Sequence, residues 1–264
     1  MKTHKTRLIK IGKDFTIGGK EIQIMAGPCA VENYEYTKRS AHACKLAGAK
    51  ILRGGAYKLR TIPGTFKGLG EKGLKILRKI ADEEKMAVVT EVIDVRDIDM
   101  VAKYADILQV GEKNMQNTVL LEAVGRTKMP ILLKRGKSAQ IDELLYAAEY
   151  IARNGNKNII LCERGIRTFE NVTRATLALA SVPILKEMCD YPVIVDPSHS
   201  TGKPSLISAM SKAAIAAGAD GLIIEVHPEP KKALCDGYQA LIPSEFKKLM
   251  KELKPVAKAV GRKL

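Results

Sequence analysis

Residues 130–165, "PILLKRGKSAQIDELLYAAEYIARNGNKNIILCERG", place two short apolar runs on either side of an amphipathic segment. The runs "PILLKRG" (130–136) and "NIILCERG" (158–165) are typical of strands buried on both faces of a parallel sheet. The segment between them has an apolar stripe with helical spacing, made of Ile141, Leu144, Leu145, Ala148 and Ile151. Asn154-Gly155 then ends the stripe. The stretch therefore predicts a strand–helix–strand unit.

The same alternation recurs along the rest of the chain. Further apolar, β-branched runs lie near 22–27, 49–55, 87–92, 107–111, 192–199 and 221–227, which makes eight in all. Eight β–α repeats at a spacing of roughly 20–35 residues favour a parallel (β/α)8 barrel, also called a TIM barrel. A doubly wound open sheet is the alternative, because the number of strands does not show that the sheet closes.

The segment before the first run predicts a β-hairpin. Its strands are expected in "RLIKIG" (7–12) and "FTIGGKEIQI" (15–24), with Gly18-Gly19 at the turn. We expect this hairpin to cap the bottom of the barrel. No linker and no break in composition divides the chain, so we expect residues 1–264 to form a single barrel domain, with residues 1–21 as its hairpin extension.

The charge of the chain restricts its partners without choosing among them. Lys and Arg number 44 against 29 Asp and Glu, a net charge of +15, which suits nucleic acid, an anionic membrane surface or small anionic substrates. Aromatic residues make up only 5% and Trp is absent, so bases would find few side chains to stack on. The basic C-terminal segment 247–264 is better explained as a solvated outer helix than as a nucleic-acid arm.

The chain also lacks the usual signs of export. The charged N-terminus "MKTHKTRLIK" has no apolar signal region, and no run approaches 18 apolar residues, so we expect no membrane span. Five cysteines are an odd number and form no CxxC pair. These features predict a cytoplasmic protein with free thiols.

Polar residues gather at the ends of the predicted strands, which in a barrel converge on the face where barrel enzymes carry their sites. One group suits a divalent transition metal such as Mn²⁺, Fe²⁺, Co²⁺ or Zn²⁺ and consists of Cys29, His199, Glu225 and Asp236. No spacing motif supports this set. The alternative is that Cys29 is a core residue and His199 a satisfied rim residue.

A second group at the strand ends is cationic: Arg53, Lys58, Arg60, Lys113, Lys134, Arg135 and Arg164. Several cations facing one cavity repel one another unless anions fill it, and phosphate and carboxylate groups are the natural ligands. The alternative is internal pairing with Glu91, Asp94, Glu112 or Glu163, which we expect at least for Arg135.

Seven motifs together resemble one enzyme family. They are "AGPCAVE" (26–32), "LRGGAYKLRT" (52–61), "VTEV" (89–92), "LLKRG" (132–136), "LCERGIRTFE" (161–170), "VDPSHS" (195–200) and "GLIIEVHPEPKKALCDGYQAL" (221–241). In this order they resemble 3-deoxy-D-arabino-heptulosonate 7-phosphate (DAHP) synthase, in its short microbial type I form. The resemblance implies a (β/α)8 barrel that condenses phosphoenolpyruvate with erythrose 4-phosphate and releases phosphate, as the first step of the shikimate pathway.

The resemblance also implies roles for individual residues. The metal ligands of the family fall on Cys29, His199, Glu225 and Asp236. Its phosphoenolpyruvate-binding cations fall on Arg53, Lys58, Lys134 and Arg164, with Lys113 where the family usually has Arg. Its erythrose-phosphate loop falls on "KLRT" (58–61), with Arg60 and Thr61 on the distal phosphate. For proton transfer we expect Lys58, and for activation of the attacking water Glu163 or a metal-bound water.

Two departures from the family pattern concern substrate affinity. Leu59 replaces a usual proline, so the loop loses a fixed φ. Glu112-Lys113 replaces a usual Ala-Arg, which loses the bidentate guanidinium fork and adds a negative charge. We therefore expect weaker phosphoenolpyruvate binding than is typical of the family, or a rearranged contact.

Three other functions compete with this interpretation. A sister enzyme condenses phosphoenolpyruvate with arabinose 5-phosphate to form 3-deoxy-D-manno-octulosonate 8-phosphate, but its corresponding loop is longer than "KLRT" (58–61). A generic metal-dependent aldolase would not need a second phosphate pocket. A basic barrel that binds nucleic acid without catalysis would show salt-dependent binding to any duplex. The family usually forms dimers or tetramers, so we expect a homodimer or homotetramer, and we expect no fused regulatory domain.

Overall fold

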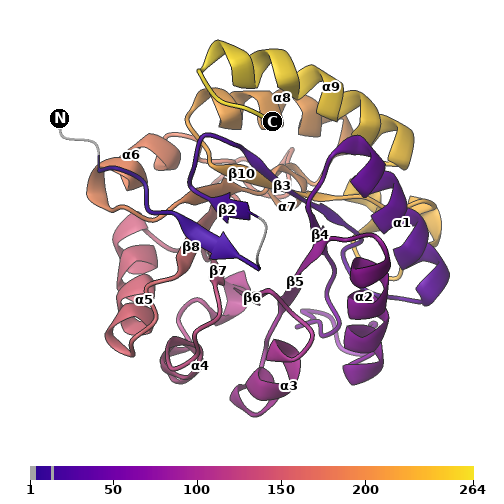
Figure 1. Ribbon diagram of the computed structural model, residues 1–264, viewed down its shortest axis with the longest axis horizontal. Helices are drawn as coiled ribbons and strands as arrows, with labels where there is room; N and C mark the ends of the chain where they lie inside the picture. Colours follow the sequence, from indigo (N-terminus) through magenta and orange to yellow (C-terminus); the bar gives the residue numbers. More distant parts are fainter. Residues whose placement is uncertain (1–3, 13–14) are drawn as a thin grey trace.

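The fold is a closed barrel of parallel strands surrounded by helices (Figure 1). The structure, a computed structural model, describes residues 4–12 and 15–264. Strands follow one another around the barrel in the order β10-β3-β4-β5-β6-β7-β8-β9, and every neighbouring pair is parallel. Because β10 pairs with β3, the sheet has no edge. The predicted (β/α)8 barrel is confirmed, and the open sheet is excluded.

Each of the eight apolar runs contains one strand of the barrel. The strands are β3 (Gln23–Gly27), β4 (Ile51–Arg53), β5 (Ala87–Glu91), β6 (Ile107–Val110), β7 (Ile131–Lys134), β8 (Ile159–Glu163), β9 (Val193–Val195) and β10 (Gly221–Glu225). In seven of the eight strands every residue is buried, and β5 is the exception. This explains why the runs are continuously apolar, since one side of each strand faces the barrel interior and the other faces the helices.

The helices lie outside the barrel, with one exception. They are α1 (Tyr34–Ala47), α2 (Glu71–Glu83), α3 (Ile98–Ala102), α4 (Thr118–Gly125), α5 (Ile141–Arg153), α6 (Ser181–Met188), α8 (Pro204–Ala216) and α9 (Pro243–Ala259). The additional short helix α7 (Pro197–Thr201) follows β9 directly. Helix α9 is the expected outer helix, which buries Leu249 and Leu253 against the barrel. No helix in the described ranges 4–12 and 15–264 has the length and apolar character that a membrane crossing requires.

The N-terminal hairpin is present, but its turn is not where the sequence predicted it. Strands β1 (Ile9–Ile11) and β2 (Phe15–Ile17) pair Ile9 with Ile17 and Ile11 with Phe15, so the chain reverses its direction between Ile11 and Phe15. Residues 13 and 14 lie outside the described part of the chain. The assignment of Gly18-Gly19 to the turn was wrong. Gly18 instead permits a close approach, because a Cβ there would lie 2.2 Å from the carbonyl oxygen of Arg7.

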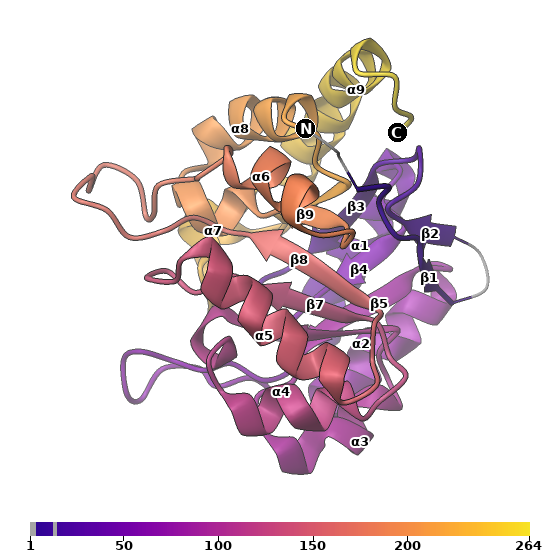
Figure 2. The ribbon, with the colours of Figure 1, turned by 90° about the vertical axis from the view of Figure 1, so that its left-hand side faces the viewer.

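The hairpin closes the N-terminal end of the barrel, as expected. Its buried residues Ile9, Ile11 and Ile17 pack on a layer of apolar side chains inside the barrel. That layer consists of Met25, Ile51, Val89, Ile107, Leu132, Ile160, Cys162, Ile194 and Ile223. Figure 2 shows the hairpin at one end of the barrel and the long loops at the other. The interior is therefore apolar at the hairpin end, which leaves the opposite end for polar groups.

Candidate active site

A polar layer lies directly above the apolar layer. Side chains of a strand point alternately to the two faces of the sheet, so the residue two positions after an inward-facing residue also faces inward. Six strands carry a polar residue at this second position: Arg53, Glu91, Gln109, Lys134, Asp196 and Glu225. Five of them are the last residue of their strand or the next one, and Gln109 is the last but one of β6. The alternation therefore gathers polar side chains at the face where barrel enzymes have their sites.

A cavity of about 240 Å³ opens at this face. All seven residues predicted to bind substrate line it: Arg53, Lys58, Arg60, Thr61, Lys113, Lys134 and Arg164. His199 and Asp236 of the predicted metal group line it as well. The two groups that the sequence separated by chemistry thus meet in one cavity.

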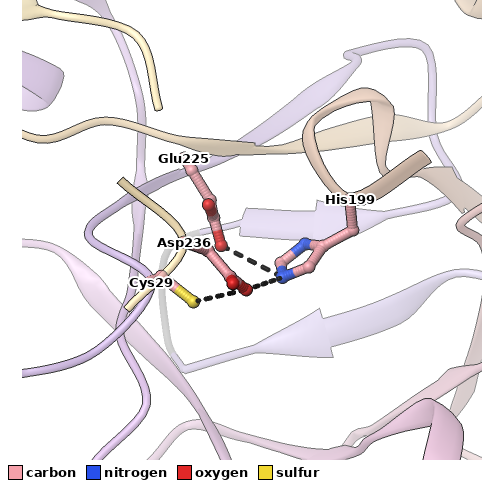
Figure 3. Close-up of side chains that lie close together, drawn as sticks. All are labelled: Cys29, His199, Glu225 and Asp236. Carbon is pink, nitrogen blue, oxygen red and sulfur yellow. Dashed lines mark hydrogen bonds and ion pairs between the residues drawn. The ribbon is translucent and has the colours of Figure 1, made fainter. Parts of the chain in front are cut away.

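The four predicted metal ligands converge on one point (Figure 3). One donor atom from each of Cys29, His199, Glu225 and Asp236 can be chosen so that all four lie within 4.8 Å of one another. Nε2 of His199 is 3.0 Å from Oε1 of Glu225 and 3.8 Å from Oδ2 of Asp236. Sγ of Cys29 is 3.6 Å from the same oxygen of Asp236. Residues up to 207 positions apart in the chain therefore form a compact cluster.

Asp196 orients the histidine of this cluster. The sequence placed His199 at the end of a strand, but β9 ends at Val195 and His199 lies in α7, which begins at Pro197. Asp196 caps this helix by accepting from the backbone N–H of His199 at 2.9 Å. Its other oxygen lies 2.7 Å from Nδ1 of the ring. The ring therefore turns Nε2 toward the cluster, in the manner of a carboxylate behind a metal-binding histidine.

Electrostatics of the cluster favour a bound cation. Burial opposes protonation of His199, but the carboxylates of Asp196 and Glu225 outweigh it and raise the pKa of the ring. A hydrogen bond with Cys235 and burial raise the pKa of the Cys29 thiol well above its ordinary range. A divalent ion would displace these protons and neutralise the crowded carboxylates. A thiol, an imidazole and two carboxylates form a donor set that fits a divalent transition metal.

Two of the buried cations are already paired with carboxylates of the site. Nη1 of Arg53 is 3.2 Å from Oε1 of Glu225, and Nζ of Lys134 is 2.5 Å from Oδ2 of Asp196. Arg164 differs, because its Nη1 is buried without a hydrogen-bond partner among the described residues. Its nearest carboxylate is that of Glu112, at 3.3 Å. Arg164 therefore has hydrogen-bonding capacity left for a ligand.

The loop at 58–61 is tied to the rest of the site by its side chains. Nζ of Lys58 lies 3.2 Å from Sγ of Cys29, and Nη1 of Arg60 lies 2.6 Å from Sγ of Cys235. Lys113 reaches across from the end of β6 and donates to Oγ1 of Thr61 at 2.8 Å and to the Leu59 carbonyl at 3.0 Å. In this structure Lys113 therefore anchors the loop at 58–61.

The position of the Glu163 side chain does not suit the role predicted for it, activation of the attacking water. This side chain is fully buried but does not line the cavity. Its Oε2 pairs with Nη1 of Arg135 at 2.8 Å, and its Oε1 accepts from the backbone N–H of Gly165 at 2.6 Å. The reason is the alternation along β8: Cys162 and Arg164 face inward, so Glu163 between them faces the helices. The pairing expected for Arg135 is present.

We expect Glu163→Gln to destabilise the protein without removing its activity. The change leaves the Arg135 guanidinium buried beside a neutral amide, and breaking a buried pair costs about 3 kcal/mol. For a chain of this size Tm should fall by roughly 6–12 °C. Thermal unfolding measures this loss, and kcat at 25 °C should stay within about threefold of wild type. Glu122→Gln, which breaks an exposed pair with Arg126, is the control and should shift Tm little. A normal Tm with a hundredfold lower kcat would contradict this prediction.

Comparison with known proteins identifies the family of the chain. The model of the DAHP synthetase I family matches residues 5–260. The chain belongs to this family. It is 53% identical over 251 residues to phospho-2-dehydro-3-deoxyheptonate aldolase of Thermotoga maritima, covering 95% of this chain and 74% of the relative. A 2-dehydro-3-deoxyphosphooctonate aldolase of Syntrophotalea carbinolica is 32% identical over 259 residues, with 91% and 92% covered.

Solved structures agree with this membership in the DAHP synthetase I family. The crystal structure of the Thermotoga maritima DAHP synthase matches with a TM-score of 0.94 and 51% identity, over 98% of this chain and 76% of that one. A truncated form of the synthase from the same organism matches with a TM-score of 0.91 and 49% identity, over 98% and 95%. The backbone that holds the cluster and the cavity is therefore that of the family.

Several residues of this family site escaped the sequence analysis. Asp196, Gln109 and Glu91 were not predicted as site residues, although counting every second position along the strands would have identified all three as inward-facing. Arg174 and Gln239 come from loops and helix ends, where no periodicity applies. Arg174 pairs with Oδ2 of Asp236 at 3.2 Å, and Gln239 donates to Oε2 of Glu225 at 2.8 Å. Two further residues were missed: Lys137 in the cavity wall, and Cys235, whose Sγ lies 3.3 Å from Sγ of Cys29.

Proposed function

We propose that this protein is a DAHP synthase: it condenses phosphoenolpyruvate with erythrose 4-phosphate and releases inorganic phosphate. The observation that carries the proposal is that four side chains able to hold a metal ion adjoin a cavity lined by all seven predicted anion-binding residues. Membership in the DAHP synthetase I family supports the same reaction. One metal-binding cluster beside several buried cations suits a reaction between two phosphorylated substrates.

In the proposed mechanism the buried cations hold phosphoenolpyruvate. Arg53, Lys134 and Arg164 present guanidinium and ammonium groups to its phosphate and carboxylate, while Arg60 and Thr61 receive the phosphate of the aldose. Holding both substrates in one cavity removes most of the entropy cost of their encounter. A divalent metal held by Cys29, His199, Glu225 and Asp236 would act as a Lewis acid toward the aldehyde oxygen.

Lys58 is the proposed proton donor. Burial disfavours its charge, but electrostatic attraction to the acidic groups of Cys29, Cys235 and Glu91 outweighs this and raises its pKa, so the side chain is an ammonium at neutral pH. When C3 of phosphoenolpyruvate attacks the aldehyde carbon, the carbonyl oxygen needs a proton to become a hydroxyl. Nζ of Lys58 lies 3.2 Å from Sγ of Cys29, one of the four proposed metal ligands, and the carbonyl oxygen would be held near these ligands. Lys58 can therefore supply the proton.

Water must then add at C2 before phosphate leaves. Glu163 faces away from the cavity, so a different carboxylate is needed to take the proton of this water. Glu91 faces inward at the end of β5 and lines the cavity. We propose Glu91 for this role in place of Glu163.

The direct test is phosphate release from phosphoenolpyruvate and erythrose 4-phosphate. Release should require both substrates, stop with EDTA and return on addition of Mn²⁺, Fe²⁺, Co²⁺ or Zn²⁺, which also identifies the preferred metal. Replacing erythrose 4-phosphate with arabinose 5-phosphate tests the octulosonate alternative. The similarity to the 2-dehydro-3-deoxyphosphooctonate aldolase of Syntrophotalea carbinolica is the reason to include this test. The absence of phosphate release with either aldose would overturn the proposal.

Lys113→Arg should lower KM for phosphoenolpyruvate severalfold. Arginine would restore the bidentate fork that the family usually has at this position. In the wild type Lys113 is held by Thr61 and Leu59, so the longer guanidinium must also leave these contacts to reach the substrate. KM for both substrates in wild type and variant measures the effect. An unchanged or higher KM for phosphoenolpyruvate would show that anchoring the loop is the main role of residue 113.

The remaining expectations about the whole protein belong to the same proposal. We propose a homodimer or homotetramer in the cytoplasm, built from one barrel domain per chain, with small-molecule substrates and no nucleic-acid partner. The mass in solution, measured by light scattering, tests the assembly. Titration with duplex DNA at two salt concentrations tests the nucleic-acid alternative, which requires tight binding that weakens steeply with salt.

A further inference from the structure

Glu112 occupies an unusual position for an acidic residue. It lies in the short helical turn Glu112–Asn114 after β6, and its carboxylate points among the cations of the substrate cavity. One oxygen is 3.3 Å from Nη1 of Arg164, and the other is 3.6 Å from Nζ of Lys137. A carboxylate thus stands between two cations of a cavity that we propose binds anions.

The pair between Glu112 and Arg164 is poorly formed. Both Oε2 of Glu112 and Nη1 of Arg164 are buried, and neither makes a hydrogen bond within the described part of the chain. Arg53 and Lys134 by contrast hydrogen-bond their carboxylate partners in the same cavity. A buried ion pair without hydrogen bonds compensates little of its desolvation. The contact is therefore one that a better-placed anion can displace.

A second cavity gives Glu112 a place to move. This outer cavity, of about 320 Å³, shares part of its wall with the substrate cavity, and both are lined by Thr61, Glu112, Lys113 and Lys137. Arg167 lines only the outer cavity. A rotation of the Glu112 side chain would move its carboxylate away from Arg164 and toward the cations of the outer cavity. The negative charge of Glu112 would then still be compensated.

We propose that Glu112 is an internal competitor of the substrate phosphate: it pairs with Arg164 in the empty site and moves to the outer cavity when an anion binds Arg164. Glu112 thereby sets the affinity of the site for phosphorylated ligands. The inference rests on the proposed function only in assigning phosphoenolpyruvate as that ligand, since inorganic phosphate probes the same guanidinium. Removing the charge while keeping the size of the side chain should therefore tighten anion binding.

The test compares binding of inorganic phosphate to wild type, Glu112→Gln and Glu149→Gln by isothermal titration calorimetry. Glu112→Gln should lower Kd about tenfold, a change of about 1.4 kcal/mol in binding free energy. Glu149→Gln, which removes the same charge from an exposed pair with Arg153, should leave Kd unchanged. Kd for phosphoenolpyruvate should follow the same pattern.

A double variant locates the effect. In the Arg164→Gln background phosphate binds more weakly, and the added change Glu112→Gln should alter Kd less than twofold, because the cation that Glu112 blocks is absent. A Kd of Glu112→Gln equal to or higher than that of wild type would overturn the inference. Tighter phosphate binding without phosphate release from the two substrates would sustain the inference and overturn the proposed function, so the two failures are distinguishable.

Discussion

Cys29→Ala should lower kcat for phosphate release by about a thousandfold and deplete the bound metal. Cys29 is the only one of the four proposed metal ligands that offers sulfur, and it is 4% exposed. Without it the ion would be held by His199, Glu225 and Asp236 alone. Lewis-acid stabilisation by a metal is worth several kcal/mol, and each 1.36 kcal/mol corresponds to a factor of ten in rate.

If Cys29 binds the metal, Cys29→Ala should lower the metal content and the rate together. Metal per protomer, measured by mass spectrometry after dialysis, should fall from about one toward zero in Cys29→Ala. Cys189→Ala, which removes a half-buried thiol bonded to the Leu185 carbonyl, is the matched control and should keep both metal and rate. Saturating metal should restore part of the rate of Cys29→Ala. A variant with full metal content and full activity would exclude Cys29 as a ligand.

The fold could be predicted because its determinants are local and repeated. Each buried strand needs a continuous apolar run, and each outer helix needs an apolar stripe, so eight repeats are visible without knowledge of the structure. The hairpin turn was misplaced for a physical reason. Glycine at a turn and glycine at a close backbone approach look alike in a sequence, and Gly18 is of the second kind.

The site was predictable only where strands carry it. Arg53, Lys134 and Arg164 stand on or directly after strands, and the alternation of inward and outward positions fixes their direction. The same rule, applied to β8, would have separated Arg164 from Glu163. Asp236 and Arg174 lie in loops whose conformation depends on contacts across the barrel, such as their own ion pair. For such residues only the resemblance to a family could indicate a role.

Lys113, which stands where the family usually has arginine, has a structural role that the sequence did not indicate. The sequence alone indicated a preserved charge with a lost fork. The structure adds that this charge anchors the loop at 58–61 through Thr61 and the Leu59 carbonyl. Leu59, which lacks the fixed φ of proline, thus gains an external restraint on its backbone. The two departures from the family pattern are in direct contact, so a Leu59→Pro change should have less effect in this chain than in a variant that lacks Lys113.

The second large effect is expected at Lys58, where two substitutions separate charge from proton transfer. Lys58→Met removes both the cation and the proton, so kcat should fall about a thousandfold, within the range of general acid catalysis, and KM for phosphoenolpyruvate should rise. Lys58→Arg keeps the positive charge, but a guanidinium does not give up its proton in proteins. Its kcat should fall nearly as far while KM stays within a few fold of wild type.

The difference between these two variants decides the role of Lys58. Its Nζ lies 3.2 Å from Sγ of Cys29 and 3.4 Å from the Cys29 carbonyl, so a merely structural role would be to position that proposed metal ligand. A structural role predicts metal loss in Lys58→Met, whereas a proton donor predicts full metal content with slow turnover. Lys248→Arg on the outer face of α9 is the control for a lysine-to-arginine change and should leave both constants unchanged. If Lys58→Arg keeps a wild-type kcat, the ammonium acts only through its charge, and the proton must come from a water in the cavity.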